Sequence, residues 1–171
     1  MTESKSWFRQ ASLLTAGEWK HGWSTINGPD FRGDPTTDEH GGSVEILVQA
    51  AGLRSGAWAR QVHGGTVLEV REAGFAGEAD ALWTDKPGLG VIGRGADCPL
   101  ILVGGSRADG SRLWGFAHAS WRSTVQGITA GLVLALTEAG ADPAAMRAVI
   151  CPSAGPCCYE VGEEVRQKAE D

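Results

Sequence analysis

The segment LWGFAHASWRSTVQGITAGLVLALTEA (residues 113–139) contains the two strongest structural signals of the chain. Leu113–His118 is a short apolar run, typical of a strand, and it ends on a histidine. Thr124–Ala139 predicts a helix with one buried face, formed by Val125, Ile128, Leu132, Leu136 and Ala139. A strand that leads into such a helix indicates a helix packed on a β-sheet.

Similar signals recur along the rest of the chain. Alternating patterns and short apolar runs between turn residues predict strands at 58–62, 66–71, 80–84, 89–94, 99–103 and 147–151. Apolar residues at helical spacing predict helices at 43–53 and 159–169. Residues 27–42, rich in Gly, Pro, Asp and Thr, are expected to form a long loop.

The order of these elements indicates an α+β domain with mixed β-sheets and flanking helices. The pair Asp109-Gly110 predicts a hairpin between the strands at 99–103 and 113–118. No GxGxxG or GxxxxGK motif follows a strand, so a nucleotide-binding doubly wound fold has no support.

Composition narrows the class of protein. A chain of 171 residues with 42% hydrophobic residues suits one globular domain over residues 1–171. The net charge of −6 argues against nucleic acid or an anionic membrane as the main partner. No secretory signal and no apolar run of about 18 residues is visible, so we expect a cytoplasmic protein. Its four cysteines are expected to be reduced thiols.

Three potential metal ligands lie beside predicted strands. His63 follows one strand, Cys98 precedes another, and His118 ends a third. Two imidazoles and one thiolate form a suitable zinc site, and three protein ligands leave the open position of a catalytic zinc. The spacing matches no local chelating motif, so a core histidine and a small buried thiol remain the alternative.

Two charged residues flank these ligands. Asp97 is expected either to support a ligand through its charge or to serve as a turn residue before the strand. Arg122 is expected either to bind an anion such as phosphate, because its planar fork pairs with two oxygens, or to form a surface ion pair.

Taken in order, six segments resemble a known family. They are HGWST (21–25), RQVHGG (60–65), ADALWT (79–84), ADCPLIL (96–102), AHASWRSTVQGI (117–128) and GPCCYEVGEEV (155–165). Together they are similar to the purine nucleoside phosphorylase family long labelled polyphenol oxidase or laccase-like, also called the YfiH family. The resemblance covers about residues 21–171.

The resemblance implies a fold, a cofactor and an activity. The fold would be a cysteine-hydrolase-like α+β architecture with mixed sheets. One zinc ion would be held by His63, Cys98 and His118. The substrates would be purine nucleosides and phosphate. The reactions would be phosphorolysis of adenosine, inosine, guanosine or methylthioadenosine, and deamination of adenosine. Asp97 and Arg122 are the candidate catalytic residues. The sequence carries no signal for the oligomeric state.

The chain departs from the family pattern at several places. Ser120 and Ser123 replace two glycines of HAGWRG, and added side chains there are expected to narrow the pocket. Ile26 replaces the arginine of HGFSTR, and a glycine replaces the usual threonine before ADC. Family chains continue past the YEVG helix, so the resemblance implies that a C-terminal part of the domain is missing here.

Two other functions are consistent with the same residues, and a third is not. Cys98 as nucleophile and His118 as base would make a metal-free cysteine hydrolase. The departures from the motifs would also suit a non-catalytic module that binds purine nucleosides. A copper polyphenol oxidase is disfavoured, because a chain with four histidines has too few for a multicopper centre.

Overall fold

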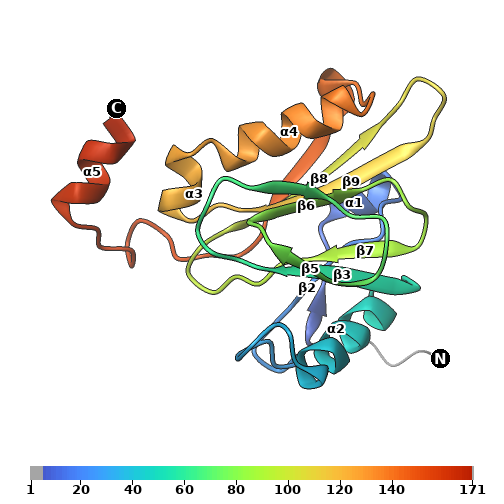
Figure 1. Cartoon of the computed structure of the whole chain (residues 1–171), viewed down its shortest axis with the longest axis horizontal. Helices are drawn as coiled ribbons and strands as arrows, with labels where there is room; N and C mark the ends of the chain where they lie inside the picture. The colour runs from blue at the N-terminus through green and yellow to red at the C-terminus, as the bar shows by residue number, and fades with distance from the viewer. Residues whose placement is uncertain (1–5, 171) are drawn as a thin grey trace.

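The segment at 113–139 forms the centre of the fold. It contains strand β9 (Arg112–His118) and helices α3 (Trp121–Val125) and α4 (Ile128–Glu138). We describe residues 6–170 from a computed structural model. The elements form four layers, in which α4 covers a five-stranded sheet, a three-stranded sheet lies beneath it, and helix α2 (Asp38–Ala50) covers that sheet (Figure 1).

The two sheets differ in direction. The larger has the order β10 (Arg147–Ile150), β8 (Leu100–Ser106), β9, β6 (Ala81–Thr84), β4 (Val67–Glu69). It is antiparallel except for the parallel pair β4 and β6. The smaller is parallel, with the order β5 (Gly74–Glu78), β3 (Ser55–Arg60), β7 (Leu89–Ile92). The expected α+β architecture with mixed sheets is confirmed.

Alternate side chains of the central strands fill two separate cores. Ala81 and Ala117 face α4 and pack with its Ile128, Leu132 and Leu136. Leu82 and Phe116, one residue along each strand, instead pack between the two sheets. Successive side chains of a strand point to opposite faces, so strands buried on both faces require apolar residues at every position.

Leu132 is expected to be a major determinant of stability. Its side chain is fully buried, and it packs so tightly that a Cβ on Gly115 of β9 would lie 2.8 Å from its Cδ1. Leu132→Ala should lower the free energy of unfolding by about 2–5 kcal/mol, measured by denaturant titration. The matched control is Leu134→Ala, because Leu134 is also on α4 but is 57% exposed. This change should lower the free energy of unfolding by less than about 0.5 kcal/mol. Equal effects would contradict this packing.

The prediction of one continuous helix over Thr124–Ala139 is wrong. The chain instead forms two helices that are separated at Gln126 and Gly127. Gly127 has φ +75°, a left-handed conformation that only glycine adopts without strain. As a result Val125 is 43% exposed rather than part of the buried face.

Other boundaries shift for local reasons. Helix α2 begins five residues before the predicted start, because the Thr37 hydroxyl accepts a hydrogen bond from the His40 amide and caps it. The long loop is therefore shorter than expected. The last helix, α5 (Glu163–Glu170), begins four residues later than predicted and lies beside α3, at one end of the molecule (Figure 1).

Several short elements were not predicted. They are β1 (Phe8–Arg9), α1 (Ser12–Ala16), β2 (Trp23–Ser24) and β5. The pair Asp142-Pro143 is typical of a helix N-cap with proline at the first helical position, and it does begin a 3-10 turn at Pro143–Ala145. Two-residue strands contain too little sequence pattern to detect. The hairpin at Asp109-Gly110 is confirmed, with Gly110 at φ +83°. No helix between residues 6 and 170 is long and apolar enough to span a membrane.

Candidate metal centre

The β8–β9 hairpin brings two of the predicted ligands together. The antiparallel register pairs Leu100 with His118, so Cys98, two residues before Leu100, lies next to the end of β9. The Ala119 amide donates to the Pro99 carbonyl (2.9 Å) and holds the two chain segments together beyond the last pair. The proximity of Cys98 and His118 therefore follows directly from the strand register.

His63 reaches the same place from the other sheet. It follows β3, which belongs to the three-stranded sheet, so the three ligands lie beside strands of two different sheets. His63 has φ +59°, an unusual conformation for a residue with a β-carbon. The site thus lies where the ends of the two sheets meet.

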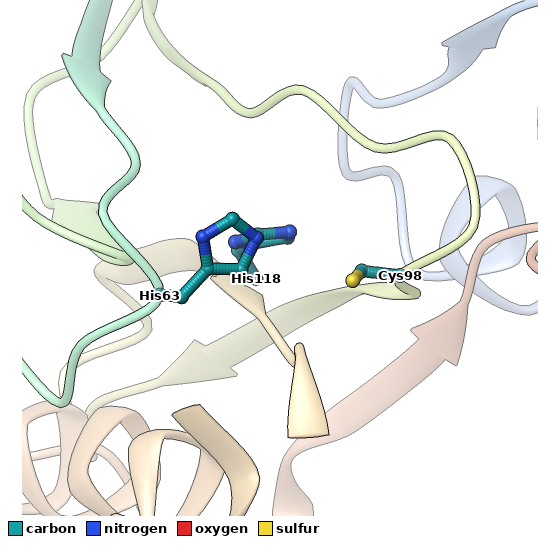
Figure 2. Close-up of side chains that lie close together, drawn as sticks. All are labelled: His63, Cys98 and His118. Carbon is teal, nitrogen blue, oxygen red and sulfur yellow. The ribbon is translucent and has the colours of Figure 1, made fainter. Parts of the chain in front are cut away.

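The three side chains converge on one point. Each residue offers one ligand atom, and these three atoms lie within 4.8 Å of one another. The rings of His63 and His118 have centroids 5.1 Å apart and are tilted by 58°. In Figure 2 the Cys98 sulfur is on the side of its residue that faces the two histidines. His118 is buried, Cys98 is half-buried and His63 is exposed, so the site is open on one side.

A buried carboxylate, Asp80, organises this arrangement. It is fully buried, and one oxygen, Oδ1, lies 2.8 Å from Nδ1 of His118. The same carboxylate accepts backbone N–H bonds from Val62 (3.1 Å), His63 (3.0 Å) and Gly64 (2.7 Å). Asp80 therefore orients His118 and fixes the backbone of the His63 loop.

The surroundings of Cys98 disfavour its ionised form. Burial raises the pKa of the Cys98 thiol, and the negative charges of Asp97 and Asp80 raise it further. No hydrogen bond joins this thiol to either histidine in the part of the chain that the structure describes. A thiolate here needs a nearby positive charge, which a bound metal cation would provide.

The two predicted catalytic residues are placed differently. Asp97 is exposed and lines the cleft above the three ligands, while its backbone carbonyl accepts a bond from the Ala154 amide (3.0 Å). Arg122 is exposed, its guanidinium stacks 4.2 Å from the centre of the Trp121 ring, and it is not among the residues that line the cleft.

The two serines that replace glycines do not narrow the cleft. Ser120 is the N-cap of α3: its hydroxyl accepts from the Ser123 amide (3.1 Å) and lies 2.8 Å from the Ser123 hydroxyl. Both residues are buried away from the cleft. Ser120 has φ −60°, which any residue adopts, so the substitutions stabilise the start of a helix.

The ligands lie in a cleft of about 790 Å³. Its walls come from the loop after β2, the His63 loop and the segment before β8; they include Ile26, Phe31, Gln61, Arg94 and Asp97. This volume is in the range of small-molecule sites. An apolar cavity near Trp19 has only about 70 Å³ and is too small for such a ligand.

Sequence reasoning missed three residues of this site: Asp80, Gln61 and Arg94. Asp80 stands directly before the apolar strand Ala81–Thr84, and a lone acidic residue next to a fully buried strand was the available signal. Gln61 and Arg94 act through backbone contacts between distant segments, which no local pattern reveals.

The remaining histidines and cysteines have other roles. His21 accepts from the Ala11 amide through Nε2 (2.8 Å), and His40 packs between Phe31 and Trp58. All four cysteines are free, as expected, and Cys151 is buried, with burial raising its pKa to about 11. The metal-ligand cluster therefore contains two of the four histidines.

Comparison with known proteins gives a family match over most of the chain. Residues 16–171 match the family described as multi-copper polyphenol oxidoreductase laccase. Among curated proteins, purine nucleoside phosphorylase YlmD of Geobacillus stearothermophilus is 30% identical, covering 95% of this chain and 67% of that protein. A purine nucleoside phosphorylase of Aquifex aeolicus is 40% identical over 92 residues, covering 53% of this chain and 40% of that protein.

Solved structures agree with this match. The crystal structure of Bacillus licheniformis hypothetical protein YfiH aligns with a TM-score of 0.69 at 27% identity, covering 88% of this chain and 64% of that one. YlmD from Geobacillus stearothermophilus aligns with a TM-score of 0.65 at 26% identity, covering 87% and 63%. The chain thus spans between 40% and 67% of the length of these relatives.

Proposed function

Because this chain belongs to the family described as multi-copper polyphenol oxidoreductase laccase, also called the YfiH family, and its curated relatives are named purine nucleoside phosphorylase, we propose that it is a zinc-dependent purine nucleoside phosphorylase. The observation that carries the proposal is the convergence of His63, Cys98 and His118 in an open cleft. The candidate substrates are adenosine, inosine, guanosine and methylthioadenosine, with phosphate as co-substrate. Deamination of adenosine is proposed as a second reaction of the site.

The residues present fit a zinc ion. Two imidazoles and a thiolate are ligands that zinc prefers, and the set of three leaves one position open. The contact between His118 Nδ1 and Asp80 leaves Nε2 as the donor atom for a metal. The anionic groups around Cys98, which raise the pKa of its thiol, are the surroundings in which a cation stabilises a thiolate.

The protein's own contribution is to hold its groups in place. When bound, zinc supplies a Lewis acid and lowers the pKa of a coordinated water to about 7. Asp80 fixes the tautomer of His118 by accepting its Nδ1–H, and fixes the backbone of His63 by accepting its amide hydrogen. The site therefore does not have to reorganise during the reaction.

The cleft offers a group for proton transfer. In phosphorolysis a phosphate oxygen bonds to the anomeric carbon of the ribose while the bond from that carbon to the purine breaks. The leaving base then takes up a proton. Asp97 is exposed on the cleft wall beside Cys98, and we assign to it the transfer of this proton to the base.

The experiment that tests the proposal is product analysis with and without phosphate. The purified chain is incubated with inosine, guanosine, adenosine or methylthioadenosine, and its zinc content is measured by elemental mass spectrometry. We expect about one zinc per chain and release of the free base that depends on phosphate. Adenosine should also give inosine without phosphate. A zinc-containing protein that leaves all four nucleosides intact would contradict the proposal.

Alkylation of Cys98 distinguishes this proposal from a metal-free cysteine hydrolase. With zinc bound, iodoacetamide should leave Cys98 unmodified while it modifies the exposed Cys157, the internal reference. After chelation, modification of Cys98 should be slow at neutral pH and accelerate above pH 9, because the raised pKa leaves little thiolate at lower pH. Peptide mass spectrometry measures both sites. Rapid modification at neutral pH, unaffected by chelation, would favour the hydrolase.

A further inference from the structure

Arg94 is an arginine that faces the candidate site, and it belongs to a loop rather than to α3. Arg94 lies two residues after β7 and lines the cleft that holds His63, Cys98 and His118. It also lines an adjoining hollow of about 330 Å³, together with Trp23 and Phe31. Its position where the two spaces meet allows it to contact a ligand that occupies either.

The guanidinium of Arg94 is held in place but not neutralised. Its Nη1 donates to the carbonyl oxygens of Phe31 and Gly33, both at 3.1 Å. Among residues 6–170 no carboxylate forms an ion pair with it, and Nε and Nη2 have no hydrogen-bond partner. Burial lowers the pKa of nearby His40, and the positive charge of Arg94 lowers it further.

The backbone of Arg94 is fixed to the loop that carries His63. Its amide donates to Gln61 Oε1 and its carbonyl accepts from Gln61 Nε2, both at 2.6 Å. Gln61 is two residues before His63, so one short loop positions both the metal ligand and the arginine. Such fixing of a cation beside a reactive site is expected where the cation binds a substrate group.

The other arginines of the region are less suited to this role. Arg32 lines the same cleft, but its guanidinium forms a two-pronged pair with Asp30 at 2.6–3.0 Å. Arg122 stacks on Trp121 and does not line the cleft. Ile26, where the family motif has arginine, is 99% exposed on the cleft wall and supplies no charge.

From this arrangement we propose that Arg94 binds the phosphate group of the substrate. Nε and Nη2, the two unpaired nitrogens, form the fork that pairs with two oxygens of a phosphate. The anion is inorganic phosphate, or the phosphate of a nucleotide if the substrate carries one. The inference rests on the proposed function for its role in turnover, whereas phosphate binding itself can be measured without turnover.

The test compares Arg94→Ala with two matched variants. Arg94→Ala should raise the KM for phosphate roughly ten- to hundredfold, because a hydrogen-bonded charge is lost, and leave the KM for inosine and the zinc content unchanged. Arg94→Lys keeps the charge and a donor for the loop carbonyls but lacks the fork. Its KM for phosphate should therefore lie between those of the wild type and Arg94→Ala. Arg32→Ala is the control and should change the KM for phosphate less than about twofold.

Binding measurements separate this inference from the proposed function. Calorimetric titration with inorganic phosphate, and separately with adenosine monophosphate, is performed on the same proteins, whose folding is checked by thermal unfolding. Phosphate binding that is lost in Arg94→Ala and retained in Arg32→Ala supports the inference even if no nucleoside is cleaved. If adenosine monophosphate binds and inorganic phosphate does not, the phosphate that Arg94 binds is that of a nucleotide. The inference is overturned if neither anion binds the wild type, or if Arg94→Ala leaves binding and the phosphate KM unchanged.

Discussion

His118→Ala is expected to abolish zinc binding and nucleoside phosphorolysis together. His118 is buried at the end of β9 and is one of the three converging ligands. A catalytic metal contributes several kcal/mol of transition-state stabilisation, so its loss should lower kcat/KM by at least about a thousandfold. Elemental mass spectrometry and a phosphorolysis assay measure the two effects.

A second ligand variant and a matched control complete this prediction. Cys98→Ser should show the same joint loss, whereas Cys157→Ser, at an exposed cysteine outside the cluster, should retain zinc and activity. Circular dichroism verifies that the variants are folded. Full turnover in a folded His118→Ala protein would refute the metal mechanism.

Asp80→Asn is expected to weaken both the metal site and the fold. Each carboxylate oxygen has two contacts: Oδ1 with the His63 amide and His118 Nδ1, and Oδ2 with the amides of Val62 and Gly64. Asparagine keeps one oxygen only, so two N–H groups would face an amide nitrogen. An unsatisfied buried donor costs about 1–3 kcal/mol, so the free energy of unfolding should fall by roughly 2–5 kcal/mol.

Zinc affinity provides the second measurement on this variant. Loss of a carboxylate that orients a ligand lowers metal affinity about 10- to 100-fold, which competition with a chelator detects. Asp97→Asn is the matched control, because this carboxylate is exposed; its free energy of unfolding should change by less than about 0.5 kcal/mol. Equal stability and zinc affinity in Asp80→Asn and wild type would show that Asp80 does not organise the site.

Local signals succeeded where burial produces a clear pattern. The strand at Leu113–His118 and the apolar face of Ile128, Leu132 and Leu136 follow from the spacing of apolar residues, because a strand and a helix bury side chains at different periods. The same reasoning failed at Gly127, where a single left-handed residue divides the predicted helix. Apolar periodicity does not report backbone conformation at one residue.

The candidate ligands and their partners differ in the same way. His63, Cys98 and His118 stand out in the sequence because their side chains have distinctive chemistry and belong to motifs that resemble a family. Asp80 and Arg94 do not stand out, because acidic and basic residues usually lie at the surface. Their roles arise from contacts with segments that are distant in the sequence.

The sequence by itself determined the fold class, the family resemblance and the three residues that can hold a metal, because these depend on residue type and local spacing. Only the tertiary structure decided how they meet: His63 lies beside one sheet, Cys98 and His118 beside the other, and the buried Asp80 contacts His118 and the His63 amide. It also placed Arg94 in the cleft and Arg122 outside it. The physical reason is that strand register and the packing of two sheets bring distant residues together, and neither is encoded in any short segment.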